Sequence, residues 1–173
     1  MVDWFHQLDP RSSIALGAGV ISLSSLILTV FVFKKRSEEN VEAAQLARQQ
    51  FTTTIRAQVS TATINSSEAG QKVTAYLAEL GKTKSKLTAA ESRHHEQLID
   101  GHESAVAALL NAYNDGCAAY IEQNVDEVHF RKTFFAEICQ LCNTKDGPIN
   151  NLLHPKVTSN YQSLWLVYEK WQP

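Results

Sequence analysis

The sequence predicts an all-α protein with one N-terminal transmembrane helix, a helical stalk or hairpin, and a small antiparallel helical bundle. Residues 14–33 form an apolar run of 20 residues without a charge. No strand-like alternation persists after residue 36, where apolar residues recur at helical spacing instead. Pro is absent from residues 11 to 147, so nothing forces a helix to break there.

The apolar run is long enough to cross a membrane. It reads IALGAGVISLSSLILTVFVF, and at about 1.5 Å of rise per residue it spans a hydrocarbon core of about 30 Å. A cleaved secretory signal needs basic residues before the run and a small-residue site after it, whereas Asp3 and Asp9 precede this run and Phe33 ends it. A buried helix of a globular core is rarely this long without a charge. We therefore expect a short N-terminus over residues 1–13 and a transmembrane helix over residues 14–33.

Basic residues beside the run predict its orientation. Lys34, Lys35 and Arg36 follow it at once, and Arg11 alone precedes it. Because Lys and Arg gather on the cytoplasmic side of a span, we expect a single-pass protein of the cell's inner membrane, with the N-terminus outside and the C-terminal domain in the cytoplasm. Trp4 is expected either at the outer interface, where aromatic rings are favoured, or in a free tail.

Small and hydroxylated residues form a stripe along the predicted span. Their spacing places them near one helix face, which lets two spanning helices approach closely and predicts self-association. The same residue types are also common in spanning helices that do not associate. The stripe consists of Ala15, Ala18, Gly19, Ser22, Ser25 and Thr29.

The charge distribution favours a membrane surface or internal pairing over nucleic acid. The formal net charge is −2. Residues 34–95 hold 10 Lys and Arg against 6 Asp and Glu, and residues 96–173 hold 5 against 10. The basic half suits an anionic cytoplasmic leaflet, and it equally suits pairing with the acidic half in an antiparallel bundle. We expect membrane lipid and a protein partner or second copy of the chain as partners, and no nucleic acid.

The body after the span divides into two predicted parts. Residues 34–100 hold few large apolar residues and are predicted to form a membrane-proximal helical stalk or hairpin, with a loop at residues 65–70. Residues 103–172 hold most of the aromatic side chains and are predicted to form the compact bundle. A heptad-like seam, which Gly81 interrupts without ending it, predicts coiled-coil packing before the bundle. The seam consists of Val73, Tyr76, Leu80, Leu87, Ala90, His94 and Leu98.

Capping residues mark the helix ends that the sequence predicts. Asp100 and Gly101 predict the end or a kink of one helix. Asn124 is predicted to cap the next helix, because Glu127 stands three residues on and acids favour the positive end of a helix dipole. A last helix is predicted over roughly residues 157–171.

One motif could carry chemistry. Cys139 and Cys142 form a CxxC, and because a structural zinc site needs four ligands, two more are required, which His129 and His154 could supply. A redox CxxC sits at a helix N-terminus, whereas this one lies near a predicted helix end. We therefore predict packing at these cysteines, no cofactor and no enzyme. The alternative is a membrane-tethered metal-binding or thiol-redox protein that uses these side chains or Glu91.

The predicted bundle contains two segments with a familiar spacing of aromatic residues. They read LLNAYNDGCAAYIEQNVDEVHFRKTFFAEI at residues 109–138 and SNYQSLWLVYEKW at residues 159–171. Together with the preceding span, they resemble uncharacterised small bacterial single-pass membrane proteins with a helical C-terminal domain of unknown function. The resemblance implies a helical domain and supplies no activity or site.

The sequence as a whole predicts a membrane-anchored helical interaction or scaffold protein with a cytoplasmic domain. Two alternatives stay open. One is the metal or thiol-redox protein described above. The other is an envelope-facing coiled-coil factor of opposite topology.

Overall fold

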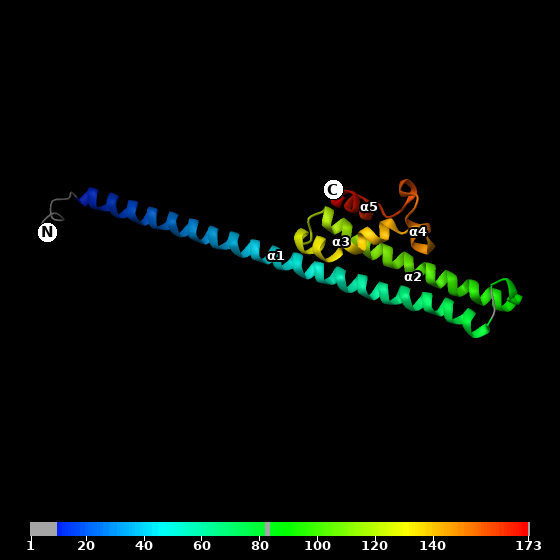
Figure 1. Cartoon of the computed structure of the whole chain (residues 1–173). Helices are drawn as coiled ribbons and strands as arrows, with labels where there is room; N and C mark the ends of the chain where they lie inside the picture. The colour runs from blue at the N-terminus through cyan, green and yellow to red at the C-terminus, as the bar shows by residue number, and fades with distance from the viewer. Residues whose placement is uncertain (1–9, 82–83, 173) are drawn as a thin grey trace. The chain divides into compact units, whose positions relative to one another are not determined.

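The chain is helical throughout the part that the structure describes. The computed structural model describes the backbone of residues 10–81 and 84–172, and the side chains of residues 29, 31–81, 84 and 86–172. No strand occurs among these residues, so the all-α prediction is confirmed. Five α-helices and two 3-10 turns follow one another in the order α1 (Pro10–Leu80), η2 (Lys84–Lys86), α2 (Ala89–Ile121), α3 (Glu127–Asn143), α4 (Gly147–Leu153), η3 (Lys156–Thr158) and α5 (Gln162–Trp171) (Figure 1).

The predicted transmembrane segment lies in the first part of α1. The side chains of residues 14–28 and 30 lie outside the described residues, as does Trp4. Thr29 is the one described member of the small-residue stripe, and it is exposed. Among the side chains that are described, no helix is both long enough and apolar enough to cross a membrane.

Two compact units divide the chain, Met1–Leu46 (unit 1) and Ala47–Pro173 (unit 2). In unit 1, every side chain from residue 31 to residue 46 is exposed. The ammonium groups of Lys34 and Lys35 each lie 4.0 Å from the carboxylate one turn further along the helix, on Glu38 and Glu39. Exposed pairs of this kind contribute little to stability.

Unit 2 is built on an antiparallel helix pair, formed by the second part of α1 and by α2 (Figure 1). Near the tip of the pair, the Tyr76 hydroxyl donates a hydrogen bond to the backbone carbonyl of Glu91 at 3.3 Å. Near the other end, Gly116 lies against the Ile55 side chain. Residue numbers fall along α2 as they rise along α1, so the two helices run in opposite directions.

The connection between α1 and α2 corrects one prediction. The seam was expected to continue through Gly81, but α1 ends at Leu80, and Gly81 takes a φ of +56°, a left-handed conformation that glycine adopts without a steric penalty. α2 then begins with a capping box. The Thr88 hydroxyl accepts from the Glu91 N–H at 3.3 Å, and the Glu91 carboxylate accepts from the Thr88 N–H at 2.7 Å.

Two predicted breaks are absent. α1 continues through residues 65–70, and α2 continues through Asp100 and Gly101. α1 and α2 contact each other at these residues, because Gly70 of α1 lies against the imidazole of His102 of α2. Packing of one long helix on another therefore outweighs the low helix propensity of Gly and Asn at these positions.

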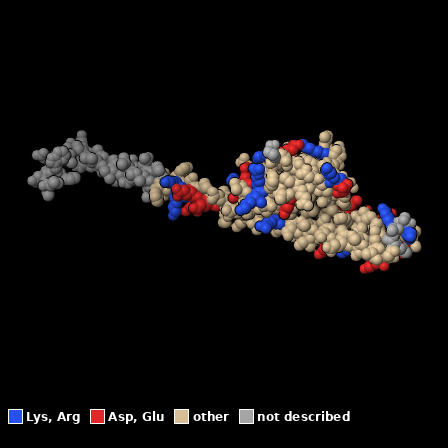
Figure 2. Space-filling model, viewed as in Figure 1, with Lys and Arg blue, Asp and Glu red and all other residues tan. Residues whose placement is uncertain are grey.

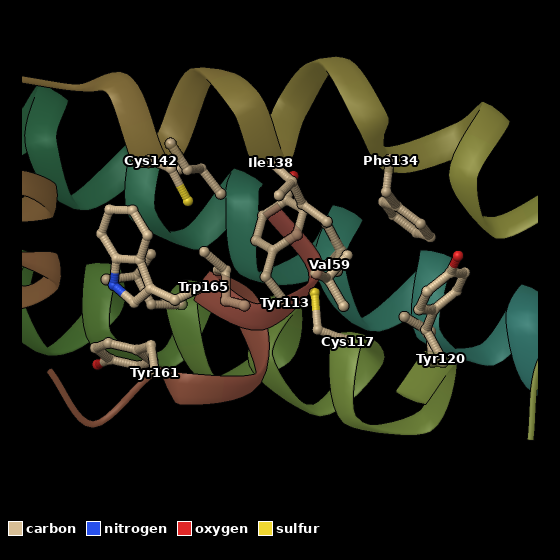
Figure 3. Packing of buried hydrophobic residues seen from close by; sticks show 14 of the residues in the cluster. Val59, Tyr113, Cys117, Tyr120, Phe134, Ile138, Cys142, Tyr161 and Trp165 are labelled. Carbon is tan, nitrogen blue, oxygen red and sulfur yellow. The ribbon is translucent and has the colours of Figure 1, made fainter. Parts of the chain in front are cut away.

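The hydrophobic core forms where α3, α4 and α5 cover α2 (Figure 3). It also includes Ile55 and Val59 of α1, and the polar Thr52 of α1 is buried as well; the sequence had assigned all three to the stalk. These α1 residues cover a face of the bundle that would otherwise meet water, so part of the predicted stalk belongs to the core unit. The largest fully buried side chains include Leu110, Cys117, Val125, Phe130, Phe134, Ile138, Leu153, Leu164 and Val167.

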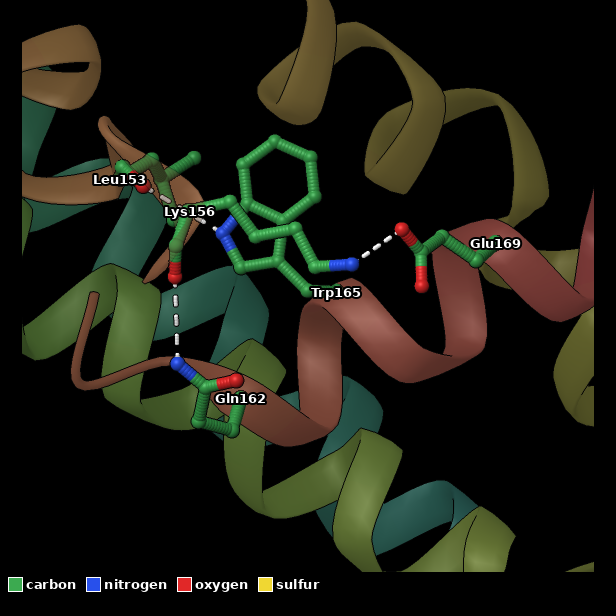
Figure 4. A network of polar contacts seen from close by, with 5 residues as sticks. All are labelled: Leu153, Lys156, Gln162, Trp165 and Glu169. Carbon is green, nitrogen blue, oxygen red and sulfur yellow. Dashed lines mark hydrogen bonds and ion pairs between the residues drawn. The ribbon is translucent and has the colours of Figure 1, made fainter. Parts of the chain in front are cut away.

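Polar contacts fasten the C-terminal segment to the core (Figure 4). The indole N–H of Trp165 donates to the carbonyl of Leu153 at 3.3 Å. The Gln162 amide donates to the carbonyl of Lys156 at 3.2 Å, and the Lys156 ammonium pairs with the Glu169 carboxylate. These bonds tie α5 to the end of α4 and to the turn η3 that precedes α5, and Trp165 itself is buried as a core residue.

Candidate functional site

A cavity of about 530 Å³ opens between α1 and α3 in unit 2. α3 runs antiparallel to α2, since Tyr120 packs on Phe130 with ring centroids 5.4 Å apart and Tyr113 bonds to Glu137 further along. α1 and α3 therefore run in the same direction on either side of α2. The cavity is a short groove with one of these helices as each wall.

The floor of the cavity is apolar and its walls are mainly polar. The floor residues are buried in the core cluster or at its edge, whereas most of the wall residues are exposed. This is the usual composition of a binding site, in which apolar contact supplies affinity and a few polar groups supply orientation. The floor consists of Val59, Leu109, Tyr113, Phe134 and Leu141, with Ile149 at one end, and the walls consist of Arg56, Ser60, Thr63 and Ile64 from α1 and Thr133, Glu137, Gln140 and Thr144 from the α3 side.

One polar pair links the floor to a wall. The Tyr113 hydroxyl donates a hydrogen bond to the Glu137 carboxylate at 2.8 Å. Burial raises the pKa of Tyr113 well above its ordinary value, and the hydrogen bond to Glu137 and the charge of that carboxylate raise it further. Tyr113 is therefore a neutral hydrogen-bond donor at neutral pH.

Opposite charges stand on opposite walls. Arg56 lines the cavity from α1 and Glu137 lines it from α3. Neither side chain forms an ion pair with another described residue. The site therefore offers one cationic and one anionic group above an apolar floor, and it can receive a surface that carries both signs of charge.

A second hollow lies between α1 and α2 and has a different character. Its volume is about 550 Å³, and none of its lining residues is charged. Small side chains make it shallow, and no titratable group reaches it. The lining residues are Thr54, Ala57, Gln58, Thr61, Ala62, Asn65, Ala105, Ala108 and Ala112.

Cys142 of the CxxC is buried in the core of the bundle (Figure 3), whereas Cys139 is half-buried and accepts a hydrogen bond from the Gln172 amide at 3.6 Å. Burial raises the pKa of Cys142 to about 12, with a smaller contribution from Cys139. Burial also raises the pKa of Cys117, which lies near Cys142 in the core. Thiols that stay protonated at neutral pH are poor nucleophiles, and buried ones pack as small apolar groups.

The other candidate metal ligands lie apart. His129 is exposed near the start of α3, where its backbone N–H donates to Asp126. His154 packs edge-on against Trp165, with ring centroids 5.2 Å apart, and Glu91 belongs to the capping box of α2. No group of three or more His, Cys, Asp or Glu side chains in the described part of the chain is placed to hold a metal ion.

The histidine on the predicted seam is another correction. His95 is buried and His94 is exposed, whereas the seam had placed His94 inward. Tyr76 stacks on His95, with ring centroids 6.4 Å apart, and meets His94 edge-on at 4.8 Å. The break at Gly81 divides the seam between two helices. The spacing of apolar residues before the break therefore does not determine which side of α2 faces inward after it.

Sequence reasoning did not identify the cavity. Arg56 and Glu137 lie far apart in the chain, and no local spacing connects them. Only the packing of α1 and α3 on α2 brings the two side chains to one groove. The candidates that the sequence did single out, the CxxC and the two histidines, lie outside its lining.

Comparison of this chain with protein families, with curated proteins and with solved structures found no match. The resemblance to small bacterial single-pass proteins therefore stays a prediction. The proposals below depend on the residues and geometry of this chain alone.

Proposed function

We propose that this chain is a single-pass membrane protein whose helical C-terminal unit is a non-catalytic interaction module at the cytoplasmic face of the inner membrane. The observation that carries the proposal is the uncharged run at residues 14–33, which Lys34, Lys35 and Arg36 end at once. The backbone of α1 is helical through the whole run. A helix of 20 uncharged, mainly apolar residues matches the thickness of a bilayer core, and basic residues at its end favour the cytoplasmic side.

The cavity of unit 2 supports the interaction role. Its apolar floor and its two opposed charges suit the docking of another surface. A general acid or base works best with a pKa near the operating pH, whereas the pKa of Tyr113 at the floor is raised well above its ordinary value. Tyr113 is therefore suited to hydrogen bonding, which supports a binding role for the floor of the cavity.

Extraction of membranes with alkaline carbonate tests the anchor. We expect the full chain to stay in the membrane pellet, and a variant without residues 14–33 to be released. The double substitution Val20→Arg and Leu26→Arg is expected to release the chain as well, because each charge at the centre of a span costs about 2.5–3.5 kcal/mol on insertion scales. A matched substitution beyond the span, Leu46→Arg, is expected to leave the protein in the pellet. Release of the unaltered chain by carbonate would refute the anchor.

A protease-protection experiment tests the orientation. A tag placed after Pro173 is expected to resist protease added to intact spheroplasts and to be digested once they are lysed. Digestion in intact spheroplasts would support the envelope-facing alternative, while leaving the anchor itself in place.

A further inference from the structure

The cavity between α1 and α3 is distinguished by its apolar floor, because charge alone does not mark it. Figure 2 shows Lys, Arg, Asp and Glu side chains scattered over the visible face of unit 2. In the cavity, two opposite charges flank a buried apolar floor, to which Val59, Tyr113 and Phe134 belong (Figure 3). The volume of about 530 Å³ lies within the range of pockets that hold small molecules, about 300–1,000 Å³.

The hydroxyl groups that line the cavity are set as hydrogen-bond acceptors. Thr63, Thr133 and Thr144 each donate to the backbone carbonyl four residues earlier in the chain, at 2.8–2.9 Å. The Tyr113 hydroxyl donates to Glu137. Because a hydroxyl has one hydrogen and two lone pairs, these four oxygen atoms can only accept from a ligand. A ligand that matches the cavity therefore supplies N–H or O–H donors.

The two charges of the cavity lie at about the same level along α2. Arg56 follows Ile55, which lies against Gly116 of α2, and Glu137 accepts from Tyr113 of α2. Gly116 and Tyr113 are three residues apart, which is about 4.5 Å along a helix axis. Arg56 and Glu137 therefore flank the same part of the apolar floor, one on each wall.

Both charges can receive a ligand group. Oε2 of Glu137 accepts from Tyr113, and no described residue donates to its Oε1. An ammonium group has three donors and no acceptor, so it fits this carboxylate together with the hydroxyl oxygen of Thr133, one helical turn earlier on the same wall. The guanidinium of Arg56 can bind both oxygens of a carboxylate.

We propose that the cavity binds a short peptide with free ends and apolar side chains. Its ammonium pairs with Glu137, its carboxylate pairs with Arg56, and its side chains cover the floor. Each peptide unit supplies an N–H for the acceptor oxygens and a carbonyl that Ser60 or Gln140 of the walls can reach as donors. A glycerophospholipid, whose headgroup can also carry both charges, has no backbone amide to match these oxygens. The proposal rests on the binding role proposed for the cavity.

Titration calorimetry of the full chain in nonionic detergent micelles tests the ligand, with empty micelles as the blank. The probes are leucine, leucyl-leucine and leucyl-leucyl-leucine. We expect at least one of the two peptides to bind at least about tenfold more tightly than leucine, because both charges of leucine are attached to one carbon atom and cannot reach both walls. Its N-acetyl form, which lacks the ammonium, and its amide form, which lacks the carboxylate, are each expected to bind at least about tenfold more weakly.

Two variants assign each end of the peptide to one wall. Arg56→Gln is expected to weaken the unmodified peptide at least about tenfold and to leave the affinity of the amide form unchanged, because that form has no carboxylate to lose. Glu137→Gln, whose amide oxygen still accepts from Tyr113, is expected to weaken the unmodified peptide and to leave the N-acetyl form unchanged. Arg48→Gln and Glu96→Gln make the same changes at exposed positions outside the cavity, and we expect no effect on any of the three forms.

Three results would overturn the peptide site: no binding of either peptide at millimolar concentration, equal affinity for free leucine, or variants that weaken the unmodified and blocked peptides alike. The last result would show that Arg56 and Glu137 maintain the shape of unit 2 and do not contact the ends of the peptide. None of the three would alter the carbonate extraction or the protease protection, so failure of the peptide site and failure of the proposed membrane protein are distinguishable.

Discussion

At the scale of single residues, Gly116 shows how closely α1 approaches α2. Its side-chain position faces the core, where a Cβ atom would lie 2.9 Å from Ile55 Cγ2 and 3.4 Å from the Phe130 ring. A separation under 3 Å between carbon atoms forces a neighbour to move. A larger residue at position 116 would clash with its neighbours. Glycine therefore allows α1, α2 and α3 to pack closely at this point.

We expect Gly116→Ala to destabilise unit 2 by about 1 kcal/mol. Overpacking costs about 2 kcal/mol, and the gain in helix propensity returns about 1 kcal/mol. Gly101 is the matched control in the same helix, since a Cβ there would meet no atom within 4 Å. Gly101→Ala is expected to stabilise by about 0.5–1 kcal/mol. Urea unfolding measures both, and equal stabilisation by the two substitutions would contradict the close contact.

At the scale of elements, the start of α3 is determined by burial of the residue before it. Val125 and Phe130 both belong to the core, at the positions of a hydrophobic staple on either side of the helix start. Burial of Val125 makes Asp126 the capping residue, and its carboxylate accepts from the His129 N–H at 2.9 Å. Asn124, the cap that the sequence predicted, instead donates its side-chain amide to Glu122 at 2.9 Å. That prediction was wrong by two residues.

Asp126→Ala is expected to lower the free energy of unfolding by about 1 kcal/mol, because the helix loses both a capping hydrogen bond and a favourable charge at its N-terminus. Asn124→Ala, which removes only an exposed side-chain contact, is expected to change it by less than about 0.5 kcal/mol. Thermal or urea unfolding of the two variants distinguishes the caps. A larger loss of unfolding free energy for Asn124→Ala than for Asp126→Ala would show that Asn124 caps the helix, as the sequence predicted.

At the scale of the whole molecule, the core of unit 2 needs helices from both ends of the chain. The core cluster begins with Ile55 and Val59 of α1 and ends with Trp171 of α5. The fragment over residues 103–172, which the sequence predicted as the compact bundle, therefore lacks one face of its own core.

Truncation tests this composition. A fragment of residues 47–173 is expected to unfold cooperatively in urea, with the midpoint of the corresponding transition in the full chain. A fragment of residues 81–173 is expected to lose that cooperativity, because each large apolar side chain removed from a core costs about 2–5 kcal/mol and domains this small have only about 5–15 kcal/mol in total. Circular dichroism measures both. Cooperative unfolding of the shorter fragment would show that the core of unit 2 folds without α1.

The sequence by itself determined the helical class and the apolar run of α1, because both are local properties: hydrophobic spacing within one helix, and the absence of charge over 20 residues. Tertiary structure alone decided that α1 and α2 continue through their Gly and Asn residues, and that His95 is buried in place of His94. It also decided that Arg56 and Glu137 line one cavity from opposite walls. Contacts between distant parts of a chain leave no periodicity in the sequence, so only the packed helices reveal them.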